Sequence, residues 1–213
     1  LIKLNNLDEN SLIDLDPRFG AIFPELVNVI GGKYSFSNGN FFFQKGKYEE
    51  KHIRNQHKLG TKSETVFNPI KGTDLSNNMT AEGFRKIGVI QQLLLKKSLD
   101  PGVSGPLFWD EPESNMNPKL MKLLVEMMLE LSRNGQQIII ATHDYVLLKW
   151  FDLLMDKEKD DYVKFHVLNR KKNGEVSINS CDSYKQVDEN AITSTYSDLY
   201  DAEIDRSLGE VSL

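Results

Sequence analysis

The chain has 213 residues, of which 39% are hydrophobic and 27% are charged, an ordinary globular balance. Its net charge of −5 gives no basic footprint, so the composition does not support nucleic-acid binding. A lone cysteine, Cys181, excludes an internal disulfide framework and a cysteine-based zinc site, and it favours a cytoplasmic protein. The apolar runs fall short of the ~20 residues that cross a bilayer, so we expect no membrane segment.

The N-terminal part of the chain predicts one helix and one β-hairpin. Pro24 stands near the start of an apolar run and Gly31 follows its end, which indicates a helix at about 24–30. Asn38-Gly39 between aromatic segments predicts a hairpin, because both residues tolerate positive φ. Residues 44–63 are polar and basic. We expect a solvated loop or an edge strand there, with a contact surface for a polyanion as the alternative.

The middle of the chain predicts a βαβ unit. The apolar runs at 106–110 and 137–141 are typical of two buried parallel strands. Between them, Asn117 can cap a helix that starts at Pro118, and Gly135 can end it in the left-handed conformation. The apolar side chains of this helix form one stripe, namely Leu120, Leu123, Leu124, Met127, Met128 and Leu131. The fold class is therefore α/β, with parallel core strands, flanking helices and β-hairpins.

Further elements flank this unit. A helix with an acidic first turn and a basic last turn begins after Thr80. Residues 145–154 form another apolar helix, and the charged run at 156–161 is expected to be a solvated loop. Alternating apolar residues on both sides of Asn173-Gly174 predict a second hairpin. A final helix is expected at about 196–207.

Polar side chains stand at the carboxyl ends of both predicted parallel strands. Asp110 and Glu111 end the first strand, and His143 follows the second, so all three are expected side by side where ligands of such sheets bind. Nucleotide hydrolases place two carboxylates in this way, one for magnesium and one for the attacking water. Glu113 is interpreted as a structural partner in the turn, and Trp109 as part of the sheet core.

These segments resemble the motifs of ABC-type ATPases, and more narrowly the AAA-family ATP-binding proteins related to SMC heads and OLD-type ATPases. Residues 107–113 with 115–118 look like a Walker B motif and a D-loop. Residues 141–144 are similar to the H-loop, and residues 80–85 match the place and shape of the signature motif. The motifs follow one another in the family's order between residues 76 and 150.

The resemblance implies a role for each matching residue. Asp110 would coordinate Mg²⁺, Glu111 would be the catalytic carboxylate, and His143 would be the switch histidine. The positions that approach ATP or line the dimer interface would be Glu82, Gly83, Asn115 and Asn117. The implied cofactors are ATP and Mg²⁺. The implied assembly is a head-to-tail homodimer that sandwiches ATP and drives an effector, in phage defence or nucleic-acid maintenance.

Two departures from the family pattern qualify these roles. Ala81 fills the signature serine position, which removes a hydroxyl that would contact the γ-phosphate. The P-loop is also missing, because residues 31–34 lack its hydroxyl residue and residues 60–63 lack a glycine before the lysine. We therefore expect residues 76–213 to be the C-terminal lobe of an ATPase domain and residues 1–75 an arm-like region. The P-loop lobe would lie in the same or another chain.

Three functions remain open from the sequence. The first is an ATPase head in which Glu111 activates water. The second is an ATP-gated scaffold or dimerisation module that hydrolyses little, motivated by Ala81. The third is a metal-dependent nuclease that uses Asp110, Glu111 and Glu113 as ligands.

Overall fold

The structure is a computed structural model that describes residues 22–37, 40–54, 61–72, 75–76, 81–96, 98–99, 104–187 and 191–209. Its elements in chain order are α2 (Ile22–Ile30), β1 (Gly32–Ser37), β2 (Asn40–Arg54), β3 (Thr61–Pro69), β4 (Leu75–Ser76), α3 (Glu82–Leu95), β5 (Leu107–Asp110), η2 (Pro118–Leu120), α4 (Met121–Arg133), β6 (Ile138–Ala141), α5 (Tyr145–Leu154), η3 (Lys157–Lys159), β7 (Phe165–Arg170), β8 (Val176–Cys181), η4 (Tyr184–Gln186) and α6 (Ala191–Leu208). Within these described segments, no helix has the length and apolar character needed to cross a membrane.

Internal contacts divide the chain into two compact units. The first unit is built from residues within 1–108, 114–117 and 134–139, and the second from 109–113, 118–133 and 140–213. The two strands β5 and β6 contribute residues to both units.

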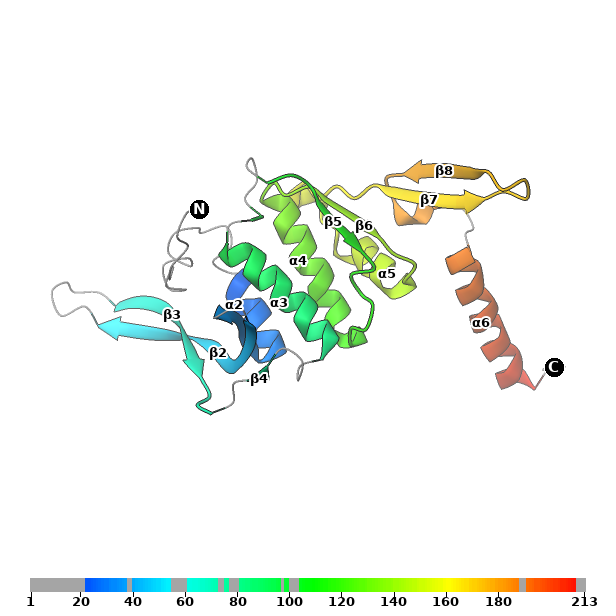
Figure 1. Cartoon of the computed structure of the whole chain (residues 1–213). Helices are drawn as coiled ribbons and strands as arrows, with labels where there is room; N and C mark the ends of the chain where they lie inside the picture. The colour runs from blue at the N-terminus through cyan, green and yellow to red at the C-terminus, as the bar shows by residue number, and fades with distance from the viewer. Residues whose placement is uncertain are drawn as a thin grey trace. The chain divides into compact units, whose positions relative to one another are not determined.

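The first unit contains a four-stranded antiparallel sheet in the order β1-β2-β3, with β4 also paired to β2 (Figure 1). The hairpin predicted around Asn38-Gly39 is confirmed by the pairing of β1 with β2, although its turn lies outside the described residues. The expectation of a loop or edge strand for this segment is confirmed as a strand for residues 44–54, which belong to β2 and of which residues 46–54 pair with β3 alone.

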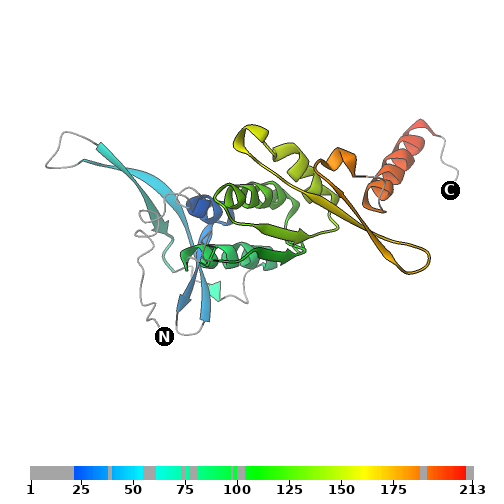
Figure 2. The same cartoon turned by 90° about the horizontal axis from the view of Figure 1, so that it is seen from above.

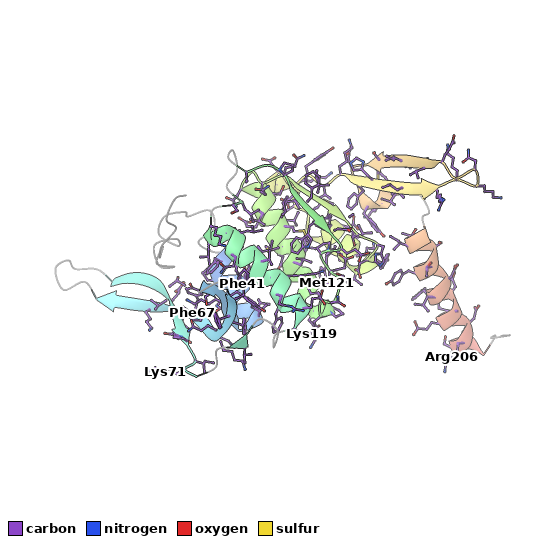
Figure 3. The ribbon with its side chains drawn as sticks, viewed as in Figure 1. Phe41, Phe67, Lys71, Lys119, Met121 and Arg206 are labelled. Carbon is purple, nitrogen blue, oxygen red and sulfur yellow. The ribbon has the colours of Figure 1, made fainter. Side chains whose placement is uncertain are left out.

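Aromatic packing explains why this basic segment forms a strand that is partly buried. Tyr48 of β2 is buried, and its ring packs against Phe67 of β3 at 5.3 Å and against Phe23 of α2 at 6.0 Å between centroids. Figure 3 labels Phe67 on its strand. Lys47 and Glu49, on either side of Tyr48, are exposed, whereas Tyr48 and Gly46 are buried, so alternation along the strand turns the charged neighbours of Tyr48 to solvent.

Helix α3 packs on β1 through polar as well as apolar side chains. Ile87 and Leu94 of α3 lie in the core. Gln91 of the same face is fully buried, and its Oε1 accepts a hydrogen bond from the backbone N–H of Tyr34 at 2.9 Å. Gln92 donates to the carbonyl of Tyr34 at 2.5 Å. These side chains hydrogen-bond directly to the backbone of β1.

The predicted βαβ unit is confirmed. The N–H of Leu107 donates to the carbonyl of Gln137 and the N–H of Glu111 to that of Ala141, both at 2.8 Å. Both bonds join residues 30 positions apart, so β5 and β6 run parallel, side by side (Figure 2). Gly135 has a φ of 93°, the left-handed conformation expected after α4.

Helix α4 connects the two strands and forms the core of the second unit. Its predicted stripe is buried, apart from half-buried Leu120 in η2, and Met121 at its start is buried as well (Figure 3). Val125 and Leu129 are also buried, so the buried surface of the helix is wider than the predicted stripe. Helix α5 begins and ends at the predicted residues, where Asp144 caps it by accepting from the N–H of Leu147 at 2.6 Å.

The expectation that both parallel strands are buried is wrong for one of their faces. Leu107, Trp109 and Ile140 are half-buried, so Trp109 is only partly in the core. The alternate residues face outward, and Phe108 is 70% and Ile139 43% exposed. The two hydrogen bonds above place Phe108 opposite Ile139, so their side chains share one open apolar face.

The last part of the chain follows the predicted hairpin and helix. Strands β7 and β8 pair antiparallel, and α6 begins earlier than expected, at Ala191 (Figure 1). Tyr196 of α6 stacks on Tyr145 of α5 with ring centroids 4.3 Å apart. Arg206 lies in the last turn of α6 (Figure 3).

The charged segment 156–161 is not simply a solvated loop. Asp161 has a side chain that is 1% exposed, and its carboxylate accepts from Arg133 Nε at 2.8 Å and Nη2 at 2.7 Å. The N–H of Asp156 donates to the same carboxylate at 2.8 Å. This bidentate contact ties the end of α4 to the segment after α5.

Candidate functional site

The candidate site begins at the shared carboxyl edge of β5 and β6. Asp110 is the last residue of β5 and is exposed, and Glu111 and His143 lie just beyond the two strand ends. Parallel pairing brings these ends together, because the N–H of Glu111 still bonds to the carbonyl of Ala141. All of these residues belong to the second unit.

Glu111 and His143 form a direct contact. His143 Nδ1 lies 3.0 Å from Glu111 Oε1, and the two side chains are 77% and 47% exposed. A carboxylate held by an imidazole in a solvent-accessible position can accept a proton from a water molecule, while the other ring nitrogen of the histidine is free to face a phosphate. The structure therefore brings together the two residues that the sequence predicted as catalytic.

The backbone of Glu111 is in a rare conformation. Its φ is 43°, within the left-handed region that residues with a side chain seldom adopt. Pro112 follows directly and is fully buried, so the turn is anchored immediately after Glu111. Such a conformation costs about 1–3 kcal/mol and persists only where the surroundings determine it, which is common at functional sites.

The exposed carboxylate of Asp110 could bind a Mg²⁺ ion whose other ligands are water and the phosphate oxygens of a nucleotide. Among the described residues, no group of three or more His, Cys, Asp or Glu side chains is arranged to hold a metal ion. Mg²⁺ in nucleotide sites is bound by one or two carboxylates, with water and phosphate oxygens completing the shell. A single accessible carboxylate at a strand end is compatible with that donor set.

Glu113 is a structural residue of the turn, as predicted. It is buried, and its Oε1 accepts a hydrogen bond from Thr142 Oγ1 at 2.5 Å. Thr142 Oγ1 in turn accepts from the N–H of Asp144 at 3.0 Å. The sequence did not reveal Thr142 as the partner, because the two residues are far apart in the chain and no local pattern links them.

The remaining predicted positions lie in the first unit, at the start of α3 and in residues 114–117. Gly83 packs so closely on this segment that a Cβ would lie 3.2 Å from the carbonyl oxygen of Asn115 and 3.1 Å from the Cα of Met116. Lys86 Nζ donates to Ser114 Oγ at 2.5 Å. The structure thus brings Gly83 and Asn115 together, a contact that sequence spacing alone did not predict.

The side chains of this second group are accessible. Glu82, Asn115 and Asn117 are exposed, and Asn115 has a φ of 58°. Ala81 precedes α3 in an extended conformation, and no side chain of this residue caps the helix. Asn117 precedes the 3-10 turn η2 rather than α4 itself, so the predicted helix starts with a tighter turn before Met121.

The two glycine-lysine segments do not form a phosphate-binding loop. Gly31 makes a turn with φ 71°, and Gly32 and Lys33 then enter strand β1 instead of a helix. Residues 61–63 belong to strand β3, and residue 60 lies outside the described part of the chain. A P-loop needs a glycine-rich turn that opens a helix, so neither segment has the required form.

Comparison with known proteins identifies one family. Residues 34–149 match the family described as "AAA domain, putative AbiEii toxin, Type IV TA system", and this match covers more than half of the chain. No curated protein sequence matches.

Several solved structures are similar at low identity. One is an SMC head bound to the C-terminal winged-helix domain of ScpA, with 14% identity, 83% of this chain and 44% of that chain covered, and a TM-score of 0.45. Another comes from work on ATP-driven dimerisation and DNA-stimulated activation of SMC ATPases, with 12% identity, 89% and 96% covered, and a TM-score of 0.42. A third is the Smc head domain with an extended coiled coil bound to the C-terminal domain of ScpA, from Pyrococcus furiosus, with 13% identity, 90% and 37% covered, and a TM-score of 0.44. The chain thus spans less than half the length of the first of these structures.

Proposed function

Because this chain belongs to the AAA domain family described above, we propose that it supplies the catalytic carboxylate and histidine of an ATPase. The observation that carries this proposal is the 3.0 Å contact between Glu111 and His143 beyond the ends of two parallel strands. In this proposal Glu111 accepts a proton from the water that attacks the γ-phosphate of ATP. His143 holds the Glu111 carboxylate and orients the same water.

Asp110 is proposed to hold Mg²⁺. When bound, the ion neutralises charge on the phosphate oxygens, which is a large part of phosphoryl-transfer catalysis. Asp110 is the last residue of β5, and Glu111 follows it in the left-handed conformation, paired with His143. One carboxylate can thus serve the metal while the other serves the water.

We propose that the start of α3 contacts ATP held by a second copy of the chain. The support is an exposed helix start with no side-chain cap, whose first-turn N–H groups suit an anion. Gly83 and Asn115 are packed together there, so Glu82, Gly83, Asn115 and Asn117 would form one side of a head-to-tail dimer interface.

The P-loop is proposed to come from a lobe outside these residues, in the same or another polypeptide. Parallel sheets are normally covered on both faces, and the two-stranded β5–β6 sheet leaves Phe108 and Ile139 exposed on one face. A lobe that adds strands and covers this face would complete both the sheet and the phosphate cradle.

The central test replaces Glu111 with Gln in the intact protein. The amide keeps the size of the side chain but cannot take a proton, so ATP turnover should fall about 100-fold or more while ATP-bound dimer accumulates. Phosphate release and light scattering measure the two effects. Glu126→Gln on the exposed face of α4 is the matched control and should leave both unchanged. Equal turnover in wild type and Glu111→Gln would refute the proposal.

A calorimetric titration of Mg-ATP into the chain alone tests the origin of the phosphate cradle. We expect no binding, because neither glycine-lysine segment opens a helix. Tight binding would show that the chain contains its own cradle, and the proposal of a separate lobe would then be wrong.

Ala81 supports a second candidate function, an ATP-gated scaffold that hydrolyses little. The residue presents no hydroxyl at the start of α3. Nucleotide-dependent dimerisation without phosphate release would favour this function over turnover. The family's description names a putative toxin of a type IV toxin–antitoxin system, which supports an effector in phage defence as the output of either function.

A further inference from the structure

Glu113 is a buried carboxylate that the proposed hydrolysis step does not use. The residue is 6% exposed, and its Oε2 is buried without a hydrogen-bond partner among the described residues. Its other oxygen, Oε1, accepts from Thr142 Oγ1. Burying a carboxylate with incomplete hydrogen bonding is costly. An apolar residue would fill the same space at lower cost, so the contact with Thr142 needs a reason.

Thr142 connects this carboxylate to the loop that carries His143. Its hydroxyl donates to Glu113 and accepts from the N–H of Asp144, so its position is set from both sides. Asp144 is itself fixed as the cap of α5 through the N–H of Leu147. His143 lies between Thr142 and Asp144, and both of its neighbours in the chain are therefore held.

The same carboxylate anchors the turn that carries Glu111. The left-handed backbone of Glu111 is bounded on one side by its own N–H bond to the carbonyl of Ala141. On the other side, buried Pro112 leads directly to Glu113. Two hydrogen bonds thus join the strand ends on either side of the Glu111–His143 contact, one from the N–H of Glu111 to Ala141 and one from Thr142 to Glu113.

We propose that Glu113 is a positioning residue, which through Thr142 holds the Glu111 turn and the His143 loop in register for the hydrolysis step. This inference rests on the proposed function of Glu111 and His143. Glu113 does not touch the reacting atoms. What it supplies is a fixed separation between two side chains that both stand on exposed loops. Small displacements of catalytic groups are known to cost up to about 100-fold in rate.

Two pairs of variants test the contact by activity in the intact protein. Glu113→Ala removes the acceptor alone. Thr142→Val keeps the shape but removes the hydroxyl, which both donates to Glu113 and accepts from the N–H of Asp144. Each variant should lower kcat about 10- to 100-fold. Glu113→Gln and Thr142→Ser keep an acceptor and a donor, so each should retain kcat within about threefold. The Kd for Mg-ATP should stay within about twofold throughout, because the contact positions groups for the chemical step. The double variant Glu113→Ala/Thr142→Val should be no slower than the slower single variant.

A second readout does not depend on ATP turnover. The chain has four histidines, so the Cε1–H resonance of His143 can be assigned by comparison with His143→Gln. At constant pH, Glu113→Ala and Thr142→Val should each move this resonance towards that of a freely exposed histidine, and Glu113→Gln and Thr142→Ser should leave it in place. An unmoved resonance together with a lowered melting temperature alone would overturn the inference, as would additive effects in the double variant. Absence of turnover in the wild-type protein would refute the proposed function, and the resonance would still report whether Glu113 positions His143.

Discussion

Two strand surfaces of this protein differ in how completely they are covered. On β1, the ring of Tyr34 is buried beneath α3, and Gly88 of α3 leaves room for it, since a Cβ at that position would overlap the ring. Gln91 and Gln92 bond to the backbone of the same tyrosine. On the β5–β6 pair, Phe108 and Ile139 stand exposed on one face.

The packing around Tyr34 is formed entirely by residues of this chain, whereas the face with Phe108 and Ile139 has no packing partner among the described residues. Around Tyr34, apolar packing and backbone hydrogen bonding are both satisfied within one unit. At Phe108 the parallel sheet has two strands among the described residues, which is few for a sheet that needs cover on both faces. We therefore expect mutations at the first contact to change the stability of the chain, and mutations at the second to change what the chain binds.

The largest effect on stability is expected from Gly88→Ala. The added methyl group would have to displace the buried ring of Tyr34, and overpacking of this kind costs about 1–3 kcal/mol. Urea unfolding measures the loss. Gly105→Ala is the control, because a Cβ there meets no atom within 4 Å, and it should change stability by less than about 0.5 kcal/mol. An unchanged midpoint in Gly88→Ala would show that the α3–β1 contact is looser than described.

Gln91→Leu should be nearly as damaging although it increases apolar character. The change removes the buried hydrogen bond from the N–H of Tyr34 to Gln91, which costs about 1–3 kcal/mol. Stability measured by urea unfolding should fall, and hydrogen exchange at the Tyr34 amide should accelerate. A more stable Gln91→Leu variant would mean that the buried glutamine is not needed to complete the edge of β1.

The ion pair between Arg133 and Asp161 in the second unit should make the stability of the protein depend on pH. Hydrogen bonds from Arg133 lower the pKa of Asp161 below its ordinary value of 3.8, despite the opposing effect of burial. A carboxyl group with a lowered folded-state pKa stabilises the protein above its unfolded pKa and loses this contribution as the pH falls through the folded pKa.

Asp161→Asn should therefore be less stable than wild type at pH 7, by about 1–2 kcal/mol. The difference should shrink below about pH 4 as Asp161 becomes protonated in the wild type. Thermal unfolding across the pH range measures it. Asp160→Asn, at an exposed neighbouring position, is the control, and a difference that persists undiminished at low pH would contradict the ion-pair explanation.

The smallest effect on stability is expected at the exposed face of the β5–β6 pair. Phe108→Ser combined with Ile139→Thr should change the unfolding free energy by no more than about 1 kcal/mol, because Phe108 is 70% and Ile139 43% exposed. The same variant should lose any self-association of the chain and its affinity for a lobe that covers this face, as seen by light scattering. Leu153→Ser is the control, as an equally exposed leucine on α5. Self-association that depends on Leu153 instead would locate the binding surface elsewhere.

Local patterns in the sequence determined much of this protein. Helices α3, α4 and α5, the left-handed Gly135 and the parallel strands β5 and β6 could all be predicted, because periodicity, caps and turn residues act over a few positions. The candidate site could be predicted to the same extent. Asp110, Glu111 and His143 each follow an apolar strand, and parallel strands bring their ends together. Their roles stay predictions until turnover is measured.

Only the tertiary structure decided the contacts between distant segments. Four such contacts are the packing of Tyr48 on α2 and β3, the hydrogen bond of Gln91 to β1, the ion pair that buries Asp161, and the hydrogen bond between Glu113 and Thr142. In two of these cases the composition predicted exposure instead of burial, because lysine-rich segments such as 44–54 and charged segments such as 156–161 are usually solvated. The physical reason is that a polar group can be buried wherever folding brings it a partner, and no local pattern specifies that partner.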